Sequence, residues 1–184
     1  MAKIYAFIAD GSEEVECLAV VDVLRRAGED VTLVSVNEGL EVKTSHGIRL
    51  ICDTTIGEAE LSDADVLFLP GGMPGTEHLA ANEKLAEALK RQAAAGKRIA
   101  AICAAPSIPG RLGLLAGKKA TCYPGFEQML LDADYVHDGV VTDGNLTTAR
   151  GLGYALDLGL ELVRLLAGAE KSSALKAQIQ YDQC

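Results

Sequence analysis

The sequence contains no tryptophan, and aromatic residues make up only 4% of its 184 residues. Apolar residues reach 49% and glycines number 19, an aliphatic composition typical of α/β domains. No apolar run approaches the roughly 20 residues of a membrane-spanning helix. The run that follows Met1, AKIYAFIA, is also too short for a signal peptide with its cleavage site. We therefore expect a soluble protein in the cytoplasm.

Basic residues are in the minority, because 17 Lys and Arg face 26 Asp and Glu and give a net charge of -9. This acidity argues against nucleic acid and against anionic membranes as partners. The cysteines are odd in number, widely spaced and without a CxxC pair, which disfavours disulfides and structural zinc. The three histidines are far apart in sequence (His46, His78 and His137). We expect neither a metal ion nor a cofactor.

Strand-like and helix-like segments alternate along the chain, which predicts a mostly parallel sheet covered by helices on both faces. No linker, repeat or low-complexity run divides the chain, so residues 1–184 are predicted to form one domain. The expected strands are 3–9, 31–36, 64–69, 98–102 and one near 119–122, with hairpins over 41–51 and 140–149. The expected helices are 13–27, 82–95, 153–166 and 170–180, with a short one after Cys103.

Cys103 stands between a buried strand and the residues Ala104 to Pro106, which suit a first helical turn. A side chain at such a junction points out of the carboxyl end of the sheet and towards the positive end of a helix. Both features favour a thiolate, which is the reactive form of cysteine. The alternative is a buried structural thiol, because free cysteines are often buried.

Glu16 lies one turn into its predicted helix, on the same face as Val20, Val23 and Ala27. A carboxyl on an apolar face needs a partner or keeps its proton, because desolvation raises its pKa. It can serve the chemistry of Cys103 from there, or it can be a carboxylate satisfied by backbone groups.

Gly71 and Gly72 follow the strand that ends at Leu69, and glycines let the backbone turn sharply and present bare N–H groups. A lone PGG sequence is most often a turn. Next to a nucleophile, the N–H groups of Gly72 and Ala104 become candidate donors of an oxyanion hole.

The motifs GSEEVE (11–16), LPGGMPG (69–75) and AAICAAP (100–106) together resemble the ThiJ/PfpI superfamily, in its DJ-1-like branch. The similarity continues through VVDVLRRAG (20–28) and TARGLG (148–153) and covers nearly the whole chain. The resemblance implies a flavodoxin-like three-layer α/β/α sandwich, similar to class I glutamine amidotransferases, and a homodimer. It also implies that Cys103 is an oxidation-sensitive nucleophile and that Glu16 is its protonated partner.

The chain departs from the family pattern at two positions. Many members have a histidine where this chain has Tyr123, whose hydroxyl is then the available donor. The protease-like branches have a histidine directly after the cysteine, where this chain has Ala104, so peptidase activity is not expected. His46 is either a turn residue or a residue of the pocket mouth, where related sequences often have an arginine.

The resemblance implies activity on a small reactive aldehyde, as in glyoxalases, or on a glycated adduct, as in deglycases. In this reading Cys103 adds to the carbonyl, Gly72 and Ala104 hold the alkoxide, and Glu16 moves the protons; Gly71 and Tyr123 line the substrate site. The alternative is a non-enzymatic redox sensor or chaperone of the oxidative stress response, in which Cys103 is oxidised to a sulfinate. A binding module with an unreactive Cys103 is a third reading.

Overall fold

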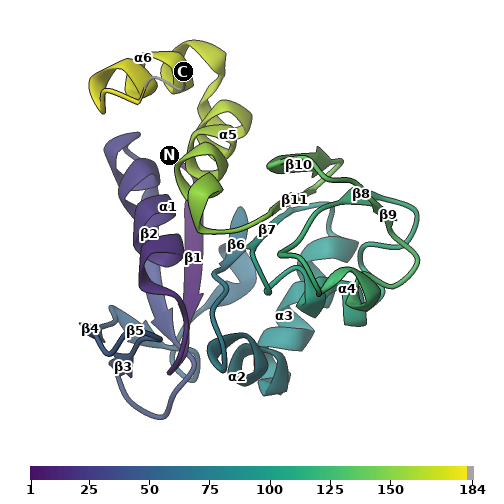
Figure 1. Ribbon diagram of the computed structural model, residues 1–184. Coiled ribbons are helices and arrows are strands. Elements are labelled where there is room, and N and C mark those ends of the chain that lie inside the picture. Colours follow the sequence, from purple (N-terminus) through teal and green to yellow (C-terminus); the bar gives the residue numbers. More distant parts are fainter. Residues whose placement is uncertain (182–184) are drawn as a thin grey trace.

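The computed structural model describes residues 1–181 as a seven-stranded sheet with helices on both faces (Figure 1). The strand order is β10-β11-β7-β6-β1-β2-β5, and every neighbouring pair is parallel except β10 with β11. The predicted mostly parallel sheet is therefore confirmed. The strands are β1 (Lys3–Ile8), β2 (Asp30–Ser35), β5 (Thr54–Thr55), β6 (Val66–Leu69), β7 (Arg98–Ile102), β10 (Val140–Asp143) and β11 (Leu146–Ala149).

Two hydrophobic cores, one on each face of the sheet, make the molecule a three-layer sandwich. One core joins the sheet to α1 (Glu14–Arg26), α5 (Ala155–Ala167) and α6 (Ala169–Gln178). The other joins it to α2 (Gly75–Ala81), α3 (Glu83–Ala94) and α4 (Ser107–Arg111). Within residues 1–181, no helix combines the length and the apolar character that crossing a membrane requires.

The burial of the central strand β1 on both faces explains why its sequence is almost entirely apolar. Ile4, Ala6 and Ile8 belong to one core, whereas Phe7 and Ala9 belong to the other. Successive side chains of a strand point to opposite faces, and here both faces are covered by helices. An uninterrupted apolar run is therefore what this position in the sheet demands.

Both predicted hairpins are present. The first pairs β3 (Glu41–Lys43) with β4 (Arg49–Ile51) as a separate two-stranded sheet. The second pairs β10 with β11 at the edge of the central sheet. Each turn contains a glycine with positive φ, Gly47 at 80° and Gly144 at 61°, a conformation that glycine adopts without steric cost.

The segment after α4 differs from its prediction. The strand expected near Lys119–Cys122 is shorter, covering Lys119–Ala120 (β8), and it pairs in parallel with β9 (Asp134–Tyr135) outside the central sheet. The reason is that β11 already occupies the free edge of β7 and carries β10 on its other side. Short 3-10 helices, absent from the prediction, lie at Leu61–Asp63 (η1), Glu127–Met129 (η2) and Leu152–Tyr154 (η3).

The helices near the sheet edge also differ from expectation. Helix α2 was not predicted, because its start after Pro74 has the composition of a turn. Helix α4 begins at Ser107 rather than next to Cys103, and it contains Pro109 and Gly110, two poor helix formers. A Cβ on Gly110 would lie 2.3 Å from the carbonyl oxygen of Met129, so close packing on η2 explains this glycine.

Candidate active site

Three neighbouring parallel strands, β1, β6 and β7, end at the same edge of the sheet. The segments that follow them are the start of α1 with Glu16, the glycines Gly71 and Gly72, and the turn at Cys103. Because the three strands are parallel neighbours, these segments lie next to one another. Ligands of open α/β sheets bind at this edge.

Cys103 adopts a left-handed backbone conformation, with a φ of 66°, which is uncommon for a residue other than glycine. Its N–H donates to the carbonyl oxygen of Ala149 at 2.9 Å, and its carbonyl accepts from the N–H of Tyr123 at 2.8 Å. These two hydrogen bonds hold the strained residue between neighbouring segments. Strain of this kind is typical of nucleophiles at strand-to-helix elbows, where it projects the side chain from the sheet.

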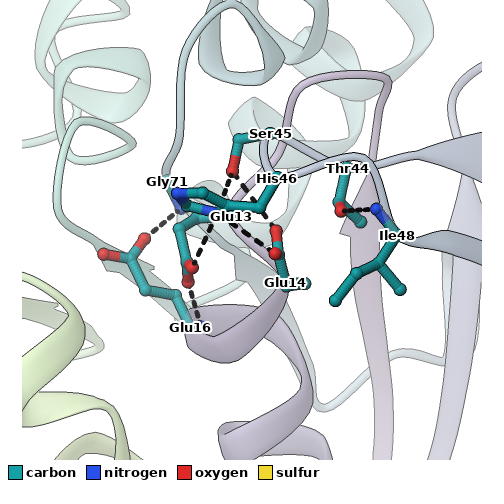
Figure 2. A network of polar contacts seen from close by, with 8 residues as sticks. All are labelled: Glu13, Glu14, Glu16, Thr44, Ser45, His46, Ile48 and Gly71. Atoms are coloured by element: carbon teal, nitrogen blue, oxygen red, sulfur yellow. Dashed lines mark hydrogen bonds and ion pairs between the residues drawn. The ribbon is translucent and has the colours of Figure 1, made fainter.

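Glu16 is buried, with 1% of its surface exposed, as its position on the apolar face of α1 predicted. One carboxyl oxygen, Oε2, accepts from the N–H of Gly71 at 3.0 Å (Figure 2). The carboxyl group also hydrogen-bonds the backbone of Leu152 and the side chain of Cys103. The predicted Glu16–Cys103 pair is therefore formed, whereas nothing in the sequence singled out Leu152.

Glu13 fixes the start of the helix that carries Glu16. As the N-cap of α1, its Oε2 accepts from the N–H of Glu16 at 2.6 Å (Figure 2). Its own N–H donates to the carbonyl oxygen of Gly71 at 2.8 Å. Helix α1 and the Gly71–Gly72 turn are thus joined directly, so the position of Glu16 relative to this turn is set by backbone contacts.

The two glycines are required by close packing. A Cβ on Gly71 would lie 2.6 Å from both the Cβ of Cys103 and Oε2 of Glu16. A Cβ on Gly72 would lie 2.3 Å from the backbone nitrogen of Glu13, and Gly72 has a φ of 89°. Only glycine at these two positions lets the cysteine and the carboxyl approach each other across the turn.

Burial raises the pKa of Glu16 from 4.5 to about 7, and the nearby charge of Glu13 adds to this rise. The hydrogen bonds from Cys103, Gly71 and Leu152 act in the opposite direction, because they stabilise the carboxylate. The predicted protonated state of Glu16 is therefore available near neutral pH. A carboxyl with this pKa is well suited to both accept and donate protons there.

The pKa of the Cys103 thiol is raised to about 12, first by burial and then by the charge and hydrogen bond of Glu16. The backbone N–H groups of Ala104 and Gly72 hydrogen-bond the sulfur and lower its pKa in part. Two features therefore oppose the thiolate that the strand-to-helix junction favours. Helix α4 starts only at Ser107 rather than next to Cys103, and burial penalises a charged sulfur.

The two shifts together describe a pair that loses a first proton near pH 7 and a second one only at high pH. In the singly ionised pair, the charge lies on the Glu16 carboxylate and the remaining proton lies on the Cys103 sulfur. The sulfur can then attack an electrophile while Glu16 takes up the thiol proton. The amides of Gly72 and Ala104 already point at this centre and can stabilise an oxyanion that forms on the substrate.

Tyr123 is half-exposed, and its backbone N–H donates to the Cys103 carbonyl. Its ring lies against Gly151, and together with Leu152 it lines a surface hollow of ≈ 340 Å³. Two backbone hydrogen bonds connect this hollow to the Glu16–Cys103 pair. The first is the bond from the N–H of Tyr123 to the Cys103 carbonyl, and in the second the backbone of Leu152 hydrogen-bonds the Glu16 carboxyl. The role of Tyr123 at the substrate site stays a prediction.

His46 lies in the turn between β3 and β4, and its Nδ1 is 3.1 Å from Glu14 Oε1 and 3.7 Å from Glu13 Oε1 (Figure 2). Of its two predicted places, the turn is the one observed. The proximity of Glu13, Glu14 and His46 could not be seen from the sequence, because His46 is more than 30 residues away from the other two. Their possible ligand atoms lie within 4.8 Å of one another, so they could hold a metal ion. Glu13 is already engaged as the helix cap, and Glu14 accepts a hydrogen bond from Ser45.

The remaining candidates have simpler places. Cys17, Cys52 and Cys122 are buried in the two cores, and Cys184 lies outside the described residues. His78 and His137 are exposed. Arg26 forms an ion pair with Asp22 on the same helix.

Comparison with known proteins gives a consistent result. The model of the DJ-1/PfpI family matches residues 2–165. "Protein DJ-1 homolog B" of Arabidopsis thaliana is 43% identical over 91% of this chain, which spans only 39% of that longer relative. The "glutathione-independent glyoxalase DJR-1.2" of Caenorhabditis elegans is 32% identical over 90% of this chain and 89% of its own length.

Among solved structures, "Toxoplasma gondii DJ-1, oxidized" superimposes with a TM-score of 0.95 at 34% identity and covers 100% of both chains. The chain belongs to the DJ-1/PfpI family.

Proposed function

We propose that the protein converts small reactive carbonyl compounds, such as methylglyoxal, into hydroxy acids, with Cys103 as the nucleophile. The observation that carries this proposal is the hydrogen-bonded pair of Cys103 and the buried Glu16 at a strained elbow. The C. elegans relative named as a glutathione-independent glyoxalase supports the same class of substrate. The reaction needs no cofactor, because the substrate is oxidised at one carbon and reduced at the next.

In the first step, the Cys103 sulfur forms a bond to the aldehyde carbon, and the electron pair of the C=O bond moves to the oxygen. Glu16 accepts the thiol proton. The N–H groups of Gly72 and Ala104 stabilise the resulting oxyanion, a contribution of about 3–4 kcal/mol for each donor in comparable sites. Protonation of this oxygen gives a hemithioacetal.

In the second step, Glu16 removes the hydrogen of the former aldehyde carbon as a proton, and the electron pair moves to the neighbouring carbonyl. Return of a proton to that neighbouring carbon gives a thioester of the hydroxy acid. Water then attacks the thioester, releases lactate in the case of methylglyoxal, and restores the thiol. The same addition to an early glycation adduct would give deglycase activity.

The test is lactate formation from methylglyoxal by the unmutated protein and by two variants. Cys103→Ser should abolish it, and Glu16→Ala should lower it by about 10²–10⁴-fold, the usual contribution of a general acid–base group. Cys52→Ser is the matched control, because Cys52 is a free cysteine buried elsewhere in the core. Equal turnover by Cys103→Ser and the unmutated protein would remove the proposal.

A redox sensor is the second candidate function. Cys103 is the one half-buried thiol among the described cysteines, and the other three are buried. Peroxide can therefore reach its sulfur first, and two equivalents of hydrogen peroxide convert a thiol into a sulfinic acid with release of two waters. Oxidation would then change stability or expose a surface for client proteins, as a redox-responsive chaperone requires.

We also propose a homodimer. Val15 and Leu18 lie three residues apart on helix α1, and their large apolar side chains remain 48% and 37% exposed. Exposed apolar side chains of this size, when contiguous, mark association surfaces. Sedimentation should show a dimer for the unmutated chain and a monomer for Leu18→Asp; a monomeric unmutated chain would refute this point. The cytoplasmic location stays a prediction.

A further inference from the structure

The hollow beside the reactive pair contains an arginine that the proposed chemistry does not use. Arg150 and Tyr123 line this hollow together with Pro124 and the segment 151–154. Arg150 follows directly after β11, whose last residue, Ala149, accepts the hydrogen bond from Cys103 N–H. The arginine is therefore placed by the same strand end that holds the nucleophile.

The guanidinium group of Arg150 has a hydrogen-bond donor without a partner. Its Nε is buried and has no hydrogen-bond partner. None of the ion pairs found among residues 1–181 involves Arg150. A buried donor without a partner costs free energy, and an arginine presents several donors in a planar fork that matches carboxylate and phosphate groups. The guanidinium group of Arg150 therefore lacks a charged partner among residues 1–181.

Two glycines place aromatic rings next to this arginine. A Cβ on Gly151 would lie 3.3 Å from Cδ2 of Tyr123, and a Cβ on Gly139 would lie 2.1 Å from Cε1 of Tyr154. Gly151 is the next residue after Arg150, and the carbonyl of Gly139 accepts the N–H of Arg150 at 2.9 Å. Both tyrosine rings therefore sit against the backbone that flanks Arg150, in the hollow that this arginine lines.

We propose that Arg150, with Tyr123 and Tyr154, forms a subsite for the anionic group of the substrate, a carboxylate or a phosphate. The preferred substrates would then be small carbonyl compounds that carry such a group, with the tyrosine rings enclosing the carbon chain between the anion and the carbonyl. This inference rests on the proposed reaction of Cys103 with carbonyls for its substrate class. The anion-binding role of Arg150 stands without it.

The first experiment tests anion binding alone, with probes that cannot react at Cys103. The full chain is labelled with ¹⁵N-arginine, and the Nε–H signal of Arg150 is assigned with the Arg150→Lys variant. Propionate, ethyl phosphate and neutral propionamide are then titrated separately. We expect a saturable shift of this signal with one or both anions and none with propionamide. The anion that binds more tightly identifies the group as carboxylate or phosphate.

The same titration is followed by calorimetry in two variants. Arg150→Gln should weaken binding about tenfold or more, as expected for a lost charge-assisted pair. Arg91→Gln removes an exposed arginine from α3 and should leave binding unchanged. No saturable shift with either anion, or equal binding by the two variants, would overturn the proposal. If Arg150→Gln does not fold, the signal of the unmutated protein decides.

The second experiment connects the subsite to Cys103 through protection from alkylation by iodoacetamide. Succinic semialdehyde should protect at about tenfold lower concentration than butanal, or glyceraldehyde 3-phosphate than glyceraldehyde, and Arg150→Gln should remove the difference. Equal protection within both pairs would overturn the substrate class. If no aldehyde protects Cys103 although anions bind, the proposed reaction fails and the anion site remains.

Discussion

The carboxyl group of Glu16 hydrogen-bonds the sulfur of Cys103 while it also accepts the N–H of Gly71 from the turn between them. Three segments that are distant in sequence thereby share one small polar centre. The carboxyl is buried and the thiol half-buried. The pKa values of both groups are raised as a result, and the chemistry depends on how the pair distributes one proton.

The first prediction concerns the pH dependence of stability. The pKa of Glu16 is raised by folding from 4.5 to about 7, so the folded state binds this proton more tightly than the unfolded state. Protonated Glu16 therefore adds to the free energy of unfolding below pH 4.5. This contribution, roughly 3 kcal/mol, is lost as the pH rises to about 7. Chemical denaturation at several pH values measures the free energy of unfolding.

Glu16→Gln is the matched control, because its neutral amide mimics the protonated carboxyl. The free energy of unfolding of Glu16→Gln should not fall in this way. The difference in free energy of unfolding between the unmutated protein and the variant should therefore change by roughly 3 kcal/mol between pH 4.5 and about 7. Parallel curves for the two proteins would show that the Glu16 carboxyl has an ordinary pKa.

The second prediction concerns Gly71. In Gly71→Ala, the new methyl group would lie 2.6 Å from Cys103 Cβ and from Glu16 Oε2, so these side chains must move apart. We expect kcat/KM for lactate formation to fall about 10²-fold, because a displaced catalytic group loses its alignment. Gly39→Ala, which meets nothing within 4 Å, should retain full activity. Normal activity of Gly71→Ala would mean that the close approach is not needed.

The third prediction concerns oxidation. Mild peroxide treatment should add two oxygen atoms to Cys103 and leave Cys17, Cys52 and Cys122 unmodified, because those three are buried. Peptide mass spectrometry locates the oxygen atoms. Oxidation of Cys17 with Cys103 spared would exclude the sensor function.

The sequence predicted much of the fold, because β1, β6 and β7 have apolar runs that only a sheet covered on both faces explains. It could not predict β9, which has two residues, or α2, whose first turn follows a proline. It likewise placed α4 too close to Cys103, since sequence alone does not show that residues 103–106 form turns. Elements this short depend on tertiary contacts rather than on local patterns.

The candidate site was predictable only where side-chain patterns in the sequence mark it. The meeting of Glu16, Gly71 and Cys103 follows from strand order and from one carboxylate on an apolar helix face. Leu152 contributes a backbone group, which no side-chain pattern reveals, and the proximity of His46 to Glu13 depends on how the β3–β4 turn folds back. The thiol pKa could not be predicted, because the desolvation that raises it is visible only in three dimensions.

The most direct test of the central claim is the pH profile of kcat/KM for lactate formation. Activity should rise about tenfold per pH unit below an apparent pKa of about 7 and then level off, because the singly ionised Glu16–Cys103 pair is the reactive form. The residual activity of Glu16→Gln should lack this step. A rate that continues to rise beyond pH 8 in both proteins, as for an ordinary thiol, would contradict the account.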